Sequence, residues 1–299
     1  MQSILKMTWM QVKLSARVRI AFFFTFIFPM VFFFVYFGLF ARSQPQVVAM
    51  LFGPLISFVV ISSSLFGLSV QLVVMRERDM LRRYHLAPIS AGEMVISRLL
   101  GNYFLFLPVI VLQYVLAVWI YHMPVQGSVF GLWLLFTLGY LALSGIGLVV
   151  AGIVNTMQDA QVFNQILFFI LMFLSGTTIP LYELPKFIQH IALVFPPTLM
   201  IVASEGMMAQ GQSLARHWPE IIGLTLTMVT SLGVAIALFR WEKEEKATRR
   251  SRIQAALALI PLIAVGLWLN YSSSFLRQNR AMFHAMGART AAHARNKHR

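Results

Sequence analysis

The stretch AMLFGPLISFVVISSSLFGLSVQLVVMRERDMLRRYHLAPIS, residues 49–90, joins an apolar run to a charged loop. Residues 49–75 contain no Asp, Glu, Lys or Arg, and a helix of this length crosses the hydrocarbon core of a bilayer, which is about 30 Å thick. The loop that follows carries six charged side chains, namely Arg76, Glu77, Arg78, Asp79, Arg82 and Arg83. This boundary predicts a membrane-spanning helix that ends in water.

The same contrast extends along the whole chain of 299 residues, which is 59% hydrophobic and 11% charged. A soluble domain has roughly 45–50% apolar and about 25% charged residues. Since lipid tolerates no unpaired backbone groups, the apolar blocks are expected to be helices, and the predicted fold class is an all-α polytopic membrane protein. Seven blocks qualify as spans, at residues 20–40, 49–75, 99–121, 128–154, 162–181, 219–239 and 254–271.

Several classes of chemistry are excluded by what the sequence lacks. With no cysteine, the chain has no disulfide, thiolate nucleophile or cysteine metal site. No P-loop and no metalloprotease or serine-hydrolase motif occurs, so we expect no enzymatic activity in this chain. The predicted spans carry no central carboxylate, because Asp159 lies at a turn, Glu205 in an external segment and Glu220 at a span end. If the protein transports, its energy is therefore expected to come from another subunit.

The distribution of Lys and Arg predicts the orientation. The net charge of +14 is best explained by lipid head groups and the positive-inside rule rather than by nucleic acid. Residues 1–19, the loop 76–98 and the segment 240–252 hold fifteen Lys and Arg, against three on the opposite side. The N-terminus is thus expected in the cytoplasm, with 1–19 as an amphipathic helix on the membrane surface; a disordered basic leader is the alternative.

The C-terminal part fits this scheme less well. Residues 241–253 are expected to be a basic cytoplasmic linker, and 254–271 an extra span that is long enough to cross once. The basic tail 272–299 would then lie outside, against the usual bias. In the alternative, 254–271 lies along the interface and the tail stays in the cytoplasm.

The loop 76–90 is long enough to form a short helix between two spans. Pro88 would stop this helix, and Ser90 followed by Glu93 is typical of a cap that starts the next one. A helix fixed at both ends can serve as a mechanical contact for an energy-supplying partner. The alternative is an ordinary positive-inside anchor.

Two stretches resemble the membrane subunits of type-2 ATP-binding-cassette (ABC) transporters. The first, RERDMLRRYHLAPIS, is similar to the coupling-helix region of those permeases, and the second, residues 155–201, is similar to their fourth-to-fifth-span turn and the segment that follows. The resemblance covers about residues 1–245. Its matching residues are, for coupling, Arg76, Glu77, Leu81, Arg82, Arg83, Pro88 and Ser90, and, for the outer segment, Ser175, Gly176, Pro180, Leu184, Pro185 and Pro197.

The resemblance implies a six-span type-2 ABC exporter transmembrane domain over residues 20–240, with 254–271 as a probable seventh span. It implies that 76–90 docks on a separate ATPase, which would bind ATP and Mg²⁺, and that this chain itself holds no cofactor. It also implies a bacterial inner-membrane location and pairing with a second copy or a homologous permease.

Residues 182–218 are expected to form external re-entrant helices that gate the exit; a packed cap without a gating role is the alternative. The expected cargo is an amphiphile such as a drug or lipid. An ion-coupled secondary transporter and a non-transporting scaffold remain as rival functions.

Overall fold

The computed structural model describes residues 7–9, 26–40, 44–85, 89–242, 253, 263–264 and 266–268, and within them the regular structure is helical. Most of the predicted surface helix 1–19, most of the linker 241–253 and the tail 272–299 lie outside the described residues. The elements are α3 (Phe28–Phe40), α4 (Pro45–Ser62), the π-helix η2 (Ser63–Ser69), α5 (Val70–Glu77), α6 (Met80–His85), α7 (Ala91–Ile120), α8 (Val129–Ile153), α9 (Met157–Leu174), the 3₁₀ helix η3 (Leu181–Glu183), α10 (Lys186–Ala192), α11 (Pro196–Gln210), the 3₁₀ helix η4 (Leu214–His217) and α12 (Trp218–Ala237).

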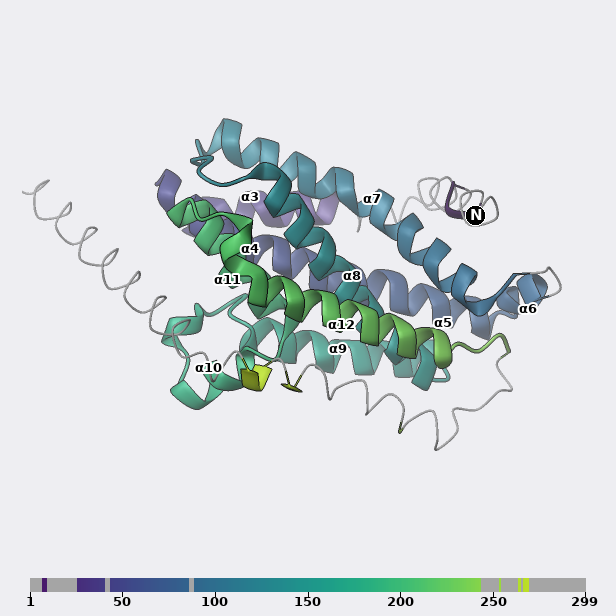
Figure 1. Cartoon of the computed structure of the whole chain (residues 1–299). Helices are drawn as coiled ribbons and strands as arrows, with labels where there is room; N and C mark the ends of the chain where they lie inside the picture. The colour runs from purple at the N-terminus through teal and green to yellow at the C-terminus, as the bar shows by residue number, and fades with distance from the viewer. Residues whose placement is uncertain are drawn as a thin grey trace, which may run out of the picture.

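Most of these helices run side by side in one bundle, with α6 at one end and α10 at the other (Figure 1). We call these the α6 end and the α10 end. Five segments of the described chain are long and apolar enough to cross a membrane, at Pro45–Glu77, Ala91–Ile120, Val129–Ile153, Met157–Leu174 and Leu214–Ala237. They match five of the predicted spans, so the all-α polytopic class is confirmed. The first predicted span, 20–40, is described only as the shorter apolar helix α3.

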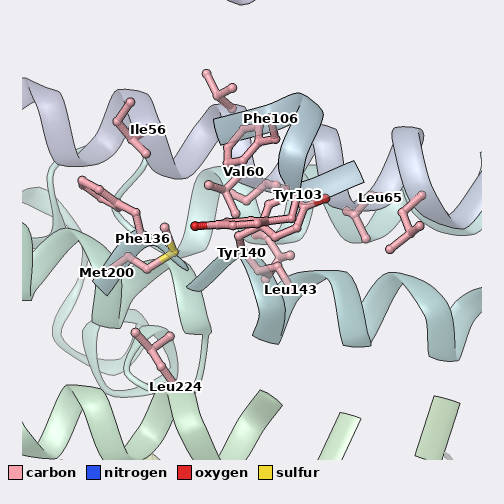
Figure 2. Close-up of a cluster of buried hydrophobic side chains, with 14 of the residues drawn as sticks. Ile56, Val60, Leu65, Tyr103, Phe106, Phe136, Tyr140, Leu143, Met200 and Leu224 are labelled. Carbon is pink, nitrogen blue, oxygen red and sulfur yellow. The ribbon is translucent and has the colours of Figure 1, made fainter. Parts of the chain in front are cut away.

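The core is built around α8, which packs against α4, η2, α11 and α12. Its central side chain is the fully buried Tyr140, whose ring stacks on Phe106 at 4.8 Å between centroids and lies beside Tyr103 (Figure 2). Lipid is as apolar as these side chains, so helix association in a membrane depends on close packing.

Small residues on α8 permit that close packing. A Cβ atom added to Gly147 would lie 2.7 Å from the Ser64 carbonyl oxygen, so only glycine allows η2 to approach this closely. At this contact the Ser64 and Ser144 hydroxyls lie 3.1 Å apart and share a hydrogen bond.

The second span contains a π-helical interruption, η2, in its middle. Wider turns of this kind are rare in proteins and occur often at functional sites. Here the amide of the fully buried Asn164 on α9 donates to the Leu65 carbonyl at 2.9 Å and to the Ser69 hydroxyl at 3.1 Å. Polar bonds thus join α9 to the irregular part of the second span.

Between α9 and α12 the chain forms two short helices, α10 and α11, bent by 97° relative to each other. Helix α11 is almost entirely buried against α4, α8 and α12, whereas α10 exposes Phe187 and Ile191 (65% and 47%). The segment 182–218 therefore contains two short helices, as the sequence predicted. Their placement on the outer side of the membrane stays a prediction.

The described residues of 254–271 lie at the α10 end. Trp268 contacts Trp218, at the first residue of α12, with ring centroids 5.3 Å apart, and Gly266 packs against Val194. Glu242 lies beyond the opposite end of α12, a helix of 20 residues that rises about 30 Å. Glu242 and Trp268 therefore lie at opposite ends of α12. Most of the residues between them lie outside the described part of the chain, so the crossing by 254–271 stays a prediction.

We therefore predict that Glu242 and the C-terminal tail lie on opposite sides of the membrane. Alkaline phosphatase, which is active only outside the cytoplasm, and a fluorescent protein would be fused in turn after Glu242 and after Arg299. The expected result is fluorescence without phosphatase activity at Glu242 and phosphatase activity at Arg299. Cytoplasmic behaviour of both fusions would show that 254–271 does not cross.

Candidate functional site

The predicted coupling loop forms the tip of the α6 end. Helix α5 stops at Glu77, the chain turns through Arg78 and Asp79, and α6 begins at Met80. Asp79 has φ +54°, a left-handed conformation that aspartate tolerates better than most residues and that permits the sharp reversal. The loop thus contains a short helix between two spans, as the sequence predicted (Figure 1).

Arg76, the second-last residue of α5, is turned inward and is only 2% exposed. Its guanidinium donates to the Ala151 carbonyl at 2.9 Å and to the Val154 carbonyl at 2.5 Å. The last carbonyls of a helix have no partner within the helix and carry partial negative charge. Arg76 therefore caps the end of α8.

A second arginine, Arg240, reaches the same point from the residues after α12. Its guanidinium, in a side chain that is 8% exposed, donates to the Asn155 side-chain oxygen at 2.9 Å and to the Val154 carbonyl at 2.5 Å. We call Arg76, Arg240, Val154 and Asn155 the arginine clasp. It joins the ends of α5, α8 and α12 through charge-assisted hydrogen bonds, which are about twice as strong as neutral ones.

Glu77 extends this connection to α9. Its carboxylate accepts a hydrogen bond of 3.2 Å from the Met157 amide, the first of α9, and so places negative charge at a helix N-terminus. Thr156 and Asp159 complete a capping box at the same turn. The neighbouring Arg76 and Glu77 thus bind the end of one helix and the start of the next.

Of the remaining predicted coupling residues that the structure describes, one is buried and holds α6 in place, and another is exposed on its outer surface. Leu81 is fully buried and fixes α6 to the core, whereas Met80 is 44% exposed. The Arg82 side chain is 66% exposed, and its Nε lies 3.8 Å from a Glu242 carboxylate oxygen. Pro88 and the side chain of Arg83 lie outside the described part of the chain.

The predicted start of the next helix is confirmed. Ser90 is the N-cap of α7 and forms a reciprocal capping box with Glu93, in which the Glu93 amide donates to the Ser90 hydroxyl at 3.2 Å. The Ser90 amide in turn donates to the Glu93 carboxylate at 2.9 Å. The coupling loop therefore has a fixed exit as well as a fixed entry.

The outer-segment candidates lie at the α10 end, most of them in the connection 175–185. Ser175 is buried with its hydroxyl 2.7 Å from that of Thr177, and Gly176 has φ +89°, a conformation that favours glycine. Pro180 and Pro185 precede η3 and α10.

The other two outer candidates also have defined structural positions. The Leu184 carbonyl accepts a bond of 2.8 Å from Gln189, which orders the start of α10. Pro197 is buried in the first turn of α11, beyond α10. Five of the six residues thus lie in the connection 175–185 and Pro197 lies in α11, and the gating role of all six stays a prediction.

Two carboxylate side chains are less exposed to solvent than the sequence predicted. Glu220, in the first turn of α12, is 4% exposed and lies 3.8 Å from His217 Nδ1. Glu205 on α11 is only partly exposed and is close enough to Tyr36 and Tyr182 to interact with them electrostatically. In the described residues, His, Asp and Glu form no group of three that could hold a metal ion.

Comparison with known proteins assigns the class. The model of the ABC-2 family transporter proteins matches residues 41–237, more than half of the chain. The chain belongs to this family of membrane transport permeases, and the resemblance seen in the sequence is confirmed. The match includes α4 to α12 and ends before Arg240 and Glu242.

Two curated relatives are similar to this chain. They are the inner membrane transport permeases YhhJ of Escherichia coli (strain K12) and of Shigella flexneri, each 25% identical over 169 residues. The aligned region is 56% of this chain and 45% of each relative. The chain therefore spans less than half the length of these relatives.

Replacing Arg76 with Met should destabilise the protein strongly. The Ala151 carbonyl loses a charge-assisted bond inside the protein, and the expected cost is about 2–3 kcal/mol. Arg82→Met is the matched control, because a solvent-exposed ion pair contributes at most about 1 kcal/mol. The measurement is the temperature at which half of the detergent-solubilised protein loses its monodisperse peak. Equal losses in the two variants would contradict the clasp.

Proposed function

We propose that this chain is the membrane-spanning permease subunit of an ABC exporter in the bacterial inner membrane, driven by separate ATPase subunits. The observation that carries the proposal is the construction of the α6 end. A short helix with an exposed outer surface is bound through its neighbours Arg76 and Glu77 to the end of α8 and the start of α9. The Val154 carbonyl, which also accepts from Arg240, connects the same point to the end of α12.

This arrangement suits the transmission of force. A displacement of α6 moves Arg76 and Glu77, because only Arg78 and Asp79 separate them from α6. Arg76 pulls on the end of α8 and Glu77 on the start of α9, while the shared Val154 carbonyl brings α12 along. Several spans would therefore tilt together when an ATPase pushes the loop, as alternation between inward-open and outward-open states requires.

Family membership and the sequence both support a separate energy source. Membership of the ABC-2 family implies that the chain works with ABC ATPase subunits. The sequence of this chain contains no P-loop that could hold nucleotide. In our proposal ATP and Mg²⁺ bind to the partners only, and the α6 end faces the cytoplasm, where ATP is available. The N-terminus then lies in the cytoplasm.

The proposed cargo is an amphiphile such as a drug or a lipid, moved outward. The support is the aromatic character of the bundle, including the stacked Phe32 and Phe58 rings, whose centroids are 4.2 Å apart. Aromatic surfaces accept apolar molecules of varied shape and also interact with their cationic groups.

An ion-coupled carrier is the second candidate, and the burial of Glu220 favours it. Such a carrier needs a titratable group on its path. Glu220 lies in the first turn of α12 rather than near the middle of that span, so we rank this function lower. In a carrier, Glu220→Gln abolishes transport, whereas in an ABC permease the variant still binds and stimulates its ATPase.

Charge reversal on the outer surface of α6 should prevent docking of the ATPase. Arg82→Glu changes an exposed side chain and leaves the arginine clasp intact, so the permease should fold and the partner should be lost. The measurement is co-purification of ATP-hydrolysing activity with the tagged chain in a mild detergent, from cells of its source organism. At least a tenfold loss relative to the wild type is expected.

The matched control is Lys186→Glu, which reverses an exposed charge at the α10 end. It should retain the co-purified ATPase. If Arg82→Glu retains the ATPase as well, the docking surface is wrong. If the wild-type chain brings no ATPase with it, the exporter proposal fails and a scaffold function is favoured.

A further inference from the structure

The helical residues 263–264 and 266–268, which lie near α10 (Figure 1), pack on the bend that joins α10 to α11. We call them the strap. The contact is made by the buried Gly266. A Cβ atom added to it would lie 3.0 Å from the Val194 Cα and would overlap a Val194 methyl group. Helices in a membrane approach each other this closely through small residues, so the strap is seated directly on the bend.

The bend joins a firmly held helix to a weakly held one. Helix α11 is almost entirely buried against α4, α8 and α12. Helix α10 has seven residues, packs mainly on α9 and η3, and exposes Phe187 and Ile191. An element with few buried apolar contacts is the first to move. A movement of α10 relative to the bundle therefore turns about residues 193–195, where the strap is seated.

The strap is packed less tightly beside α12 than it is at Gly266. Trp268 contacts Trp218, yet a cleft of about 270 Å³ stays open between these two rings, Ile222 and Ala264. A close-packed protein interior has no gap of this size. The strap therefore has room to tilt on this side without disrupting a packed core.

The strap is also an addition to the part of the chain that the family shares. The match to the ABC-2 family ends at residue 237, before the strap begins. Two strap side chains, Ile263 and Leu267, are apolar and 48% and 63% exposed, so they suit a lipid neighbour. A segment between lipid and the bend is placed to control the bend from outside the bundle.

We propose that the strap holds the bend between α10 and α11 in place and parts from it when the α10 end of the bundle opens. The contact at Gly266 keeps α10 in the position described here, and the cleft beside Trp218 gives the strap room to leave it. The inference rests on the proposed function, since it adds a restraint at the end through which cargo leaves. Each transport cycle then requires release of the strap.

The contact can be tested directly, because the chain contains no cysteine. A Cβ atom at position 266 would lie 3.1 Å from the Val194 Cβ, close to the separation of about 3.8 Å that a disulfide favours. The double variant Val194→Cys/Gly266→Cys would be reduced and then oxidised with copper phenanthroline in native membranes. Free thiols would be counted by the gel shift of a mass-tagged maleimide.

We expect most of the double variant to lose both tags while it runs at the mass of a single chain. The matched control is Val194→Cys/Leu267→Cys, which moves the second thiol to the exposed neighbour of Gly266. It should form at least five times less of the bridged species. Equal yields in the two variants would show that the strap is not seated on the bend.

The restraint is tested by locking the strap. The oxidised Val194→Cys/Gly266→Cys chain, purified with its ATPase, should hydrolyse ATP at least fivefold more slowly than the wild type treated in the same way. Dithiothreitol should restore the rate. If the bridge forms and hydrolysis is unchanged, the strap does not part from the bend during the cycle and the proposal is overturned.

A substitution without a disulfide gives the opposite change. Gly266→Leu should push the strap off Val194 and raise ATP hydrolysis at least twofold. Gly233→Leu on α12 is the control, because a Cβ atom added there meets no atom within 4 Å. A rate for Gly266→Leu no higher than that of the control would contradict the restraint. If Gly266→Leu does not fold, the disulfide experiment decides.

These outcomes separate the strap from the proposed function. If no bridge forms while ATPase activity still co-purifies with the chain, the strap is wrong and the exporter function stands. If the bridge forms and no ATPase co-purifies, the contact stands, and the exporter function fails together with the role of the strap in transport.

Discussion

The Val154 carbonyl is the point on which the order of the α6 end depends. Two buried guanidinium groups donate to it from different parts of the chain, and one of them also caps α8 at Ala151. Two positive charges tolerate burial here because the end of a helix offers several unpaired carbonyls and partial negative charge. The loop between the second and third predicted spans is thereby part of a rigid unit that includes α8, α9 and α12.

The helices of the described bundle could be predicted from the sequence because lipid imposes a simple rule of length and apolarity. The cap at Ser90 and Glu93 was equally accessible, since a capping box depends on neighbours in sequence. The different roles of the arginines could not be predicted from the sequence. Arg76 and Arg82 look alike in the motif, yet one is buried and the other is 66% exposed, and this difference arises from contacts with residues 75 or more positions away.

Arg240 was counted in the sequence as one of many orienting charges, and Asn164 was not singled out at all. Each has a defined place only because the fold brings Asn155 or Leu65 within hydrogen-bond distance. One signal was available beforehand: an asparagine inside an apolar span is expensive unless it finds a partner.

The π-helix in the second span has a consequence for how that span is held. A π-helix bonds each amide to the carbonyl five residues back, so the turns of η2 are wider than those of α4 and α5 on either side. The Asn164 amide reaches the Leu65 carbonyl and the Ser69 hydroxyl in these turns. The second span is therefore fastened to α9 at the place where its own helical geometry changes.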